Sequence, residues 1–256
     1  MSSYSLNELV DLLASPDPYL RDELAFGELA TRIESGVADD QLCALGDRLV
    51  ARLSDPAIEA RTFAVLVVGC IVERSTTAGL LSRDELLGWW ESVAAWYRSE
   101  TDLRGWDEER GWLHAVAHGA DALAAFASSP QWGADELAAL LTLVTDRLLA
   151  PTGTVFQERE DERLGRAAFT ALCRPEMSAS RATTWLEPLE RSFASAKAGP
   201  TPPWASNTLR TLRVVYVMVD RGARIDETPD VSYVPHRREV LDAVARVLRT
   251  ASPYTS

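Results

Sequence analysis

The sequence predicts an all-α protein, a curved stack of antiparallel helical hairpins (a HEAT-like α-superhelix) with about eleven helices. Three observations predict this class. Apolar residues recur at helical spacing along almost the whole chain, with no convincing strand pattern. Short links join the predicted helices, which favours antiparallel neighbours. The starts of alternate helices lie about 35–55 residues apart, a spacing similar to the repeat length of about 40–47 residues in HEAT-type proteins. Because no repeated motif accompanies this spacing, a compact globular bundle is the alternative.

Caps and breaks define the helices of the N-terminal half. Ser5-x-x-Glu8 and Ser82-x-x-Glu85 are capping boxes. Pro18 suits a first helical position. The stretch 63–72 is apolar on nearly all sides, which predicts a central, buried helix. The helices expected here cover about 5–14, 18–35, 39–53, 56–74, a segment that opens at 82, 107–127 and 134–149.

A Pro-Thr-Gly turn at 151–153 precedes the C-terminal helices. We expect these at about 157–173, 178–197, 206–221 and 235–249. Pro188 should kink the second of them. Residues 222–235 are expected to be irregular. We expect 1–256 to form a single all-helical domain, in which a subdivision would fall at the proline-rich loop 198–205; the about 55 residues beyond that loop are few for an independent core.

The composition indicates which partners and which cellular compartment to expect. The formal net charge is −12, which repels phosphate backbones and anionic lipids, so we expect neither a nucleic-acid nor a membrane partner. The longest apolar run, 62–72, is shorter than the about 20 residues of a membrane helix. Three scattered cysteines suit reduced, buried thiols. The first residues, MSSYSLNELV, lack the pattern of a signal peptide, and we expect a cytoplasmic protein.

The segment 110–121, RGWLHAVAHGAD, carries two of the three histidines of the chain. On a helix over 107–127, at about 100° per residue, His118 would lie about 40° from His114, Asp121 at about −20° and Arg110 at about −40°. These four polar side chains would then share one narrow stripe. The rest of the helix is mostly alanine and large apolar residues, which suits the interior. We therefore interpret the stripe as buried or lining a cleft, where it needs partners.

Three interpretations of the stripe stay open. In the first, His114 or His118 acts as an acid–base group or ligand in a small-molecule or hydrolytic pocket and Asp121 orients it. In the second, the same three residues hold a divalent metal ion, although they spread over about 10 Å of helix axis. In the third, the stripe is a structural ladder of hydrogen bonds between helices.

Charged residues elsewhere are candidates to meet the stripe. Glu100, Asp102 and Arg104 lie just upstream, Arg61 opens the most apolar helix, and Glu160 leans toward the apolar face of its own helix. With Arg110, we take these as candidate binding residues. The alternative for the acidic residues is helix capping and surface charge.

A protein-interaction scaffold is the alternative to the pocket, because stacked helical hairpins expose long surfaces that bind proteins. Trp132, Trp185 and Trp204 lie near predicted helix ends and are candidates for an anchor patch. A nucleotide-binding glycine loop and a GxSxG nucleophile elbow are both absent from the sequence.

Several segments together resemble a known family. They are Arg61-Thr-Phe-Ala, Glu100-x-Asp-x-Arg-Gly, Gly111-Trp-x-His-Ala-x-Ala-His-Gly-x-Asp121, and the acidic and arginine-containing run 158–163. The chain resembles the bacterial domain-of-unknown-function 2785 family along most of its length. The resemblance implies an all-helical fold and marks His114, His118 and Asp121 as defining residues. It implies no activity, so whether the chain is an enzyme stays open, as does the identity of any ligand or partner.

Overall fold

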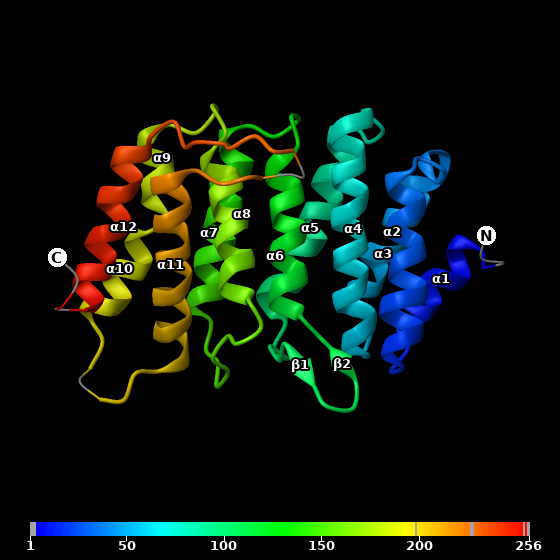
Figure 1. Cartoon of the computed structure of the whole chain (residues 1–256), viewed down its shortest axis with the longest axis horizontal. Helices are drawn as coiled ribbons and strands as arrows, with labels where there is room; N and C mark the ends of the chain where they lie inside the picture. Colours follow the sequence, from blue (N-terminus) through cyan, green and yellow to red (C-terminus); the bar gives the residue numbers. More distant parts are fainter. Residues whose placement is uncertain (1–3, 198, 226–227, 253, 255–256) are drawn as a thin grey trace. The chain divides into compact units, whose positions relative to one another are not determined.

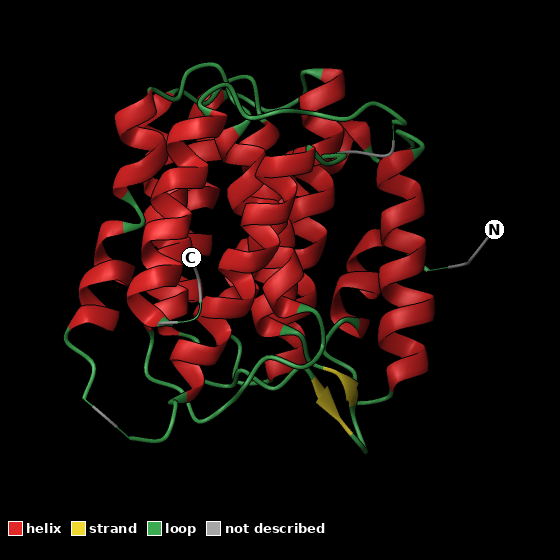
Figure 2. Cartoon of the chain, turned by 60° about the vertical axis from the view of Figure 1, so that its left-hand side comes forward, coloured by secondary structure: helices red, strands yellow, loops and turns green. Residues whose placement is uncertain are grey.

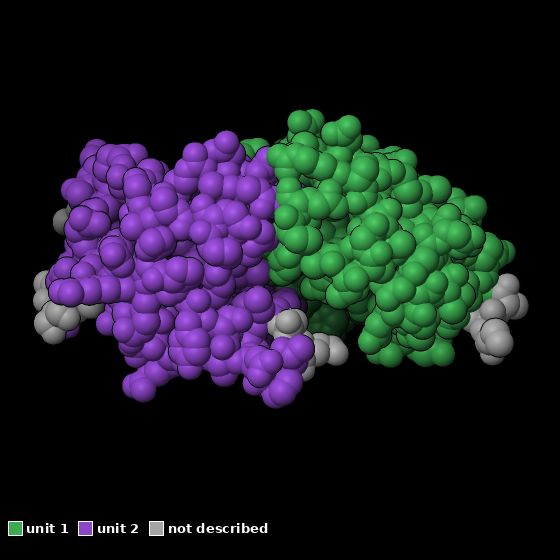
Figure 3. Space-filling model, turned by 90° about the horizontal axis from the view of Figure 1, so that it is seen from above, with its two compact units in different colours: residues 1–131 green, residues 132–256 purple. Residues whose placement is uncertain are grey.

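The computed structural model describes residues 4–197, 199–225, 228–252 and 254. These residues form twelve α-helices, three short helices of other pitch and a two-stranded sheet (Figures 1 and 2). The predicted all-helical class and the count of about eleven helices are confirmed. The chain forms two compact units, Met1–Gln131 (unit 1) and Trp132–Ser256 (unit 2), which Figure 3 distinguishes by colour. The superhelical arrangement and the single domain over 1–256 stay predictions.

Unit 1 is arranged around helix α4, which packs against α6 above all and also against α2 and α3. The capping boxes predicted at Ser5 and Ser82 both form. The elements of unit 1 are α1 (Leu6–Leu12), the π-helix η1 (Tyr19–Phe26), α2 (Gly27–Glu34), η2 (Asp39–Gln41), α3 (Leu42–Ala51), η3 (Arg52–Ser54), α4 (Ile58–Ala78), α5 (Arg83–Ser99), β1 (Trp106–Asp107), β2 (Gly111–Trp112) and α6 (Ala115–Ser128).

The central position of α4 follows from its sequence. Most of its residues between 58 and 75 are buried, as its apolar pattern predicts. Helix α6 can lie close against it because Gly69 has no side chain: a Cβ there would be 3.2 Å from the Cα of Ala122. One turn earlier on α6, the ring of Tyr97 from α5 occupies the space beside Gly119. Small residues thus set the spacing of the three helices.

Unit 2 is built around α8 and α11, which pack on each other and are flanked by α7 and α12. Its predicted ninth helix is two helices, because the chain breaks at Trp185–Leu186 and Pro188 stands in the first turn of the next helix. Residue 198 of the predicted loop lies outside the described residues. The elements of unit 2 are α7 (Ala134–Leu149), α8 (Glu160–Leu172), α9 (Ala179–Thr184), α10 (Glu187–Ala194), α11 (Pro203–Arg221) and α12 (Arg237–Ala251).

The predicted helix over 107–127 is wrong in its first two turns. Helix α6 begins only at Ala115, and residues 106–107 pair with 111–112 in an antiparallel hairpin. We call residues 104–114 the hairpin. Its strands lie beyond the N-terminal end of α6 in Figure 1, and Figure 2 shows them in yellow.

Local chemistry explains why the hairpin is not helical. The Asp107 carboxylate accepts hydrogen bonds from the main-chain N–H groups of Glu109 and Arg110, both at 3.1 Å. This side-chain turn competes with helical hydrogen bonding. Gly111 follows with a φ of 72°, in the left-handed region that glycine enters without strain. An aspartate and a glycine four residues apart therefore outweigh the helical periodicity of the neighbouring residues.

No helix in the part of the chain that the structure describes has the length and apolarity needed to cross a membrane.

Candidate functional site

His114 stands immediately before α6, not within it. It is the N-cap residue, with φ 48° and ψ 33°, a left-handed conformation that costs a non-glycine residue roughly 1–2 kcal/mol. Its main-chain N–H donates to the carbonyl oxygen of Gly105 (3.2 Å), at the start of the hairpin. The predicted stripe is therefore wrong as a helical feature: Arg110 and His114 precede the helix, and only His118 and Asp121 belong to it.

His118 is buried, with 7% of its surface exposed, and joins α6 to α4. Its Nδ1 lies 3.2 Å from the carbonyl oxygen of Thr62. Because a carbonyl only accepts, Nδ1 carries the proton and the lone pair of the neutral ring is on Nε2. The ring of Phe63 stands edge-on to the imidazole with centroids 4.9 Å apart, and the His114 ring lies 5.2 Å away. The two histidines are brought together, as predicted.

Asp121 lies one turn further along α6, half-buried, where its charge acts on the thiol of Cys70. Burial raises the pKa of Cys70 to about 12, and the carboxylates of Glu73 and Asp121 add to the rise. Within the described ranges, no three His, Cys, Asp or Glu side chains gather in a way that could hold a metal ion. The metal set of His114, His118 and Asp121 stays a prediction.

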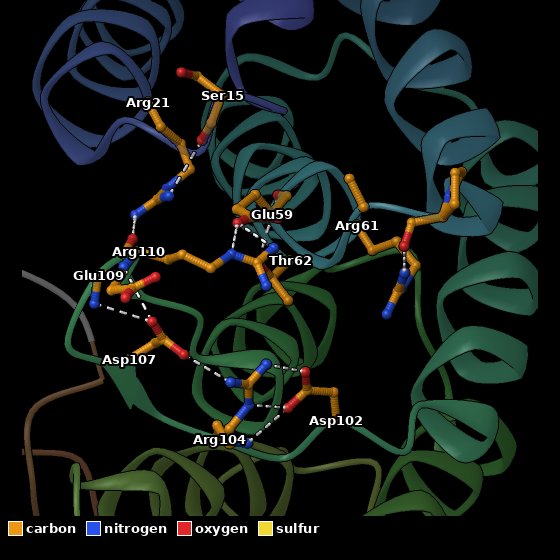
Figure 4. A network of polar contacts seen from close by, with 12 residues as sticks. Ser15, Arg21, Glu59, Arg61, Thr62, Asp102, Arg104, Asp107, Glu109 and Arg110 are labelled. Atoms are coloured by element: carbon orange, nitrogen blue, oxygen red, sulfur yellow. Dashed lines mark hydrogen bonds and ion pairs between the residues drawn. The ribbon is translucent and has the colours of Figure 1, made fainter.

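Arg110 reaches from the hairpin into the start of α4. Its Nε donates to Oε1 of Glu59 at 2.5 Å, and a second guanidinium nitrogen contacts the same oxygen (Figure 4). The Glu59 side chain is 2% exposed, whereas that of Arg110 is 35% exposed. A carboxylate buried without a cation partner would be strongly destabilising. The pair therefore pins the second strand of the hairpin against α4.

Arg21, on the π-helix η1, holds the same strand from another direction. It is fully buried, and one of its terminal nitrogens donates to the carbonyl oxygen of Arg110 at 2.9 Å (Figure 4). Its other contacts are the carbonyl of Ser15 and the carboxylate of Asp22, and its guanidinium lies 4.8 Å from the centre of the Phe63 ring. Burial raises the pKa of Asp22, against the hydrogen bond from Arg21. Arg21 thus ties the N-terminal segment to the hairpin.

Arg61 and Glu100, each predicted as a binding residue, pair with each other between α4 and the end of α5. Nε of Arg61 donates to Oε2 of Glu100 at 2.7 Å, and their side chains are 17% and 4% exposed. Glu100 also accepts from the indole of Trp96 (3.1 Å) and from the main chain of Thr101 and Asp102. Burial acts to raise the pKa of Glu100, but these donors, chiefly Arg61, hold it below its usual value. This carboxylate fixes the chain as it leaves α5.

Arg104 forms a surface cluster with the two aspartates beside it. It donates to both carboxylate oxygens of Asp102, at 2.9 and 2.6 Å, and to Asp107 at 2.7 Å (Figure 4). The hydrogen bonds from Arg104 hold the pKa of Asp102 below its usual range, and those from the main chain of Arg110 and Glu109 do the same for Asp107. The pKa of Arg104 is raised by Asp102 in turn. This cluster braces the base of the hairpin.

Glu160 is the first residue of α8 in unit 2 and is buried, in agreement with its predicted position toward the apolar face of the helix. Its Oε2 accepts the main-chain N–H of Glu158 at 2.8 Å, and burial raises its pKa, with the nearby charges of Glu158 and Asp161 acting in the same direction. That Glu160 meets the histidines stays a prediction. The residue before it, Arg159, has a φ of 66°, so α6 and α8 both begin after a left-handed residue.

Aromatic rings form a continuous row from the surface of unit 1 to its core. Trp106 and Trp112 are Cα partners in the hairpin, and their rings meet edge to face with centroids 4.5 Å apart. The Trp112 ring is stacked on His114 at 4.4 Å and 5°, and His114 leads to His118 and Phe63. Exposure falls along this row from 47% at Trp106 and 38% at Trp112 to 7% at His118 and 3% at Phe63.

Sequence reasoning missed Arg21, Glu59 and the exposed Trp106–Trp112 pair. Glu59 carries a readable signal, an acidic residue at the start of the most apolar helix, two positions before Arg61. Arg21 carries none, because its partner is 89 residues away. The predicted tryptophan anchors fail as a patch, since Trp132 and Trp185 are buried at 1% and 5% exposure.

A shallow hollow of about 480 Å³ lies on α3 and α5 of unit 1. None of the predicted site residues lines it; its lining residues are Asp47, Val50, Asp84, Glu85, Gly88 and Trp89.

The comparisons with known proteins agree with the resemblance in the sequence. The family described as "Protein of unknown function (DUF2785)" matches residues 49–217, a span from α3 to α11 that contains the hairpin, both histidines and Glu160. No curated protein and no solved structure matches the chain. Because the match covers more than half of the sequence, the chain belongs to the DUF2785 family.

Proposed function

We propose that this protein is an interaction module and that its contact surface is the Trp106–Trp112 pair of the hairpin. The observation that carries the proposal is that two large aromatic side chains, 47% and 38% exposed, stand on a hairpin that buried charges hold in place. Tryptophan is enriched at the centres of protein interfaces because it contributes a large apolar area with few rotatable bonds. A rigid support lowers the entropy cost of binding further.

Under this proposal the predicted site residues are the supports of the surface. Arg110 pairs with buried Glu59, and Arg104 with Asp102 and Asp107. His118 fixes the start of α6 through Thr62. We place the protein in the cytoplasm, consistent with three free cysteines, and its net charge of −12 argues against nucleic acid and anionic membranes as partners.

A selection from a displayed library of random peptides tests the proposal. Wild type is the target, and each enriched clone is measured again on Trp106→Ala/Trp112→Ala. The control is Tyr216→Ala/Tyr233→Ala, which removes two aromatic side chains that are 37% and 62% exposed in unit 2. We expect clones that bind the control as they bind wild type and lose at least tenfold in affinity for the tryptophan variant. Clones that bind all three proteins equally would refute the proposal.

The second candidate function is a small-molecule or hydrolytic pocket at His114, His118 and Asp121. One observation favours it: the Thr62 carbonyl fixes the Nδ1–H tautomer of His118 and leaves its basic nitrogen, Nε2, on the other side of the ring. In this reading His118 is the general base. Hydrolysis of p-nitrophenyl acetate by wild type, His118→Ala and His118→Asn tests it, because a catalytic His118 requires loss of the activity in both variants. Elemental analysis of wild type and His114→Ala tests the metal form of this candidate.

A further inference from the structure

We infer that the Trp106–Trp112 surface takes a basic peptide segment, one with several arginine or lysine side chains, of a partner protein. The inference rests on the proposed function and names its ligand.

The turn that joins the two tryptophan-bearing strands carries negative charge. Glu108 and Glu109 are both exposed and connect β1 to β2. The arginines of the hairpin do not offset this charge: Arg110 is directed to buried Glu59, and Arg104 is shared by two carboxylates. The charge that a partner meets at the turn is therefore that of the two glutamates.

Indole faces and carboxylates recognise the same class of group. A guanidinium or ammonium ion is attracted to the face of a tryptophan ring, with about 0.5–1 kcal/mol at exposed sites and more when water is excluded. Carboxylates within reach add charge-assisted hydrogen bonds, which an arginine can form in pairs. An acidic partner would be repelled by the turn, and the net charge of −12 would slow its approach and speed that of a basic one.

The geometry favours a peptide over a single small cation. The rings meet edge to face at 4.5 Å, and one face of Trp112 is stacked on His114, so the two indoles do not enclose a cation between parallel faces. The two glutamates belong to a turn that joins strands of only two residues each. A segment with several basic side chains can contact a ring and a carboxylate at once, and such contacts reinforce one another because one backbone holds them.

Fluorescence anisotropy with a labelled nine-residue peptide of alternating arginine and glycine tests the inference, at about 0.1 M salt. A glutamate–glycine peptide of equal length and free arginine are the comparison ligands. We expect the basic peptide to bind at least tenfold more tightly than either. Trp106→Ala/Trp112→Ala should weaken it at least tenfold without any change in net charge, whereas Trp106→Phe/Trp112→Phe should retain most of the affinity.

Charge is tested separately with Glu108→Gln/Glu109→Gln, for which we expect a three- to tenfold loss. The matched control Glu91→Gln/Glu239→Gln removes two exposed charges elsewhere and should change affinity less than twofold. Equal losses in both pairs, or full binding by the tryptophan-to-alanine variant, would overturn the inference, since binding would then depend on net charge alone. If wild type ignores the basic peptide while library clones without basic residues bind through the tryptophans, the inference fails and the proposed function stands. If no tryptophan-dependent clone exists, both fail.

Discussion

The imidazole Nδ1–H of His118 donates to the carbonyl oxygen of Thr62, 3.2 Å away. This bond joins α6 to α4 at the level where the hairpin meets the helices, because Arg110 reaches Glu59 less than one turn earlier on α4. Glu59 and the Thr62 carbonyl, both on α4, therefore hold the segment 104–118 in place together.

The buried ion pair at the hairpin should matter more than the surface one. Arg110→Ala leaves the 2% exposed Glu59 without its cation. We expect the free energy of unfolding to fall by about 2–3 kcal/mol, less than the about 3–5 of a wholly buried pair because Arg110 is partly exposed. Arg104→Ala, at an exposed cluster, should cost about 0–1 kcal/mol. Urea unfolding measures the stability of both variants. Equal losses of unfolding free energy would contradict the greater importance of the buried ion pair. Hydrogen exchange of residues 106–112 should rise most in Arg110→Ala.

Substitution by alanine should change stability in opposite directions at two helical glycines. A Cβ at Gly119 would lie 2.3 Å from Cε2 of Tyr97, whose hydroxyl is held by the carbonyl of Val116. Overpacking of this kind costs about 1–3 kcal/mol. At Gly88, on α5, a Cβ meets nothing within 4 Å, so Gly88→Ala should gain up to about 1 kcal/mol from helix propensity. Thermal denaturation distinguishes them, and a stabilised Gly119→Ala would show that the ring moves freely.

The backbone at His114 should favour glycine over alanine. With a φ of 48°, alanine keeps the left-handed strain and loses the stacked ring on Trp112, whereas glycine loses only the ring. We expect His114→Gly to be about 1 kcal/mol more stable than His114→Ala. Arg159, with a φ of 66° and an exposed side chain, is the matched site, and there glycine should be more stable than the wild-type arginine. At both sites we expect the glycine variant to be more stable than the alanine variant. An alanine variant more stable than the glycine variant at either site would contradict the prediction.

Glu100 should contribute to acid sensitivity. Its pKa is lowered in the folded state, so the stability it contributes is present above the unfolded value of about 4.3 and is lost as pH falls through the lower folded pKa. Glu100→Gln should lower the unfolding free energy by about 2–3 kcal/mol at pH 7 and flatten its decline below pH 4.5. Denaturant titrations from pH 3 to 7 measure this slope. The exposed Glu91→Gln should keep the wild-type slope, and an unchanged slope in Glu100→Gln would refute the prediction.

Local signals in the sequence predicted most of the fold. Capping boxes at Ser5 and Ser82 and the apolar run of α4 appear where the sequence places them. The predicted helix over 107–127 is wrong in its first two turns because one aspartate side chain and one glycine redirect the main chain there. The spacing of apolar residues does not show whether a side-chain turn will replace helical hydrogen bonds at a given position.

The candidate site was predicted in part, and for a partly incorrect reason. His114 and His118 do lie together, but through a left-handed residue and a ring contact, not through one helical face. Arg61 and Glu100 were named as binding residues and pair with each other. The partners of Arg110 lie 51 and 89 residues away in the sequence, and pairings at that distance leave no spacing pattern for a single sequence to show.

These long separations have a consequence for the order of folding. We expect a contact that closes a loop of 51 or 89 residues to form after the local helices, since the chain entropy lost in closing it must be offset by structure already present. On this argument the tryptophan pair would become ordered only when η1 and α4 have docked. A nascent or damaged chain lacking that docking would not display the surface, so recognition through the hairpin would be confined to molecules whose first unit has finished folding.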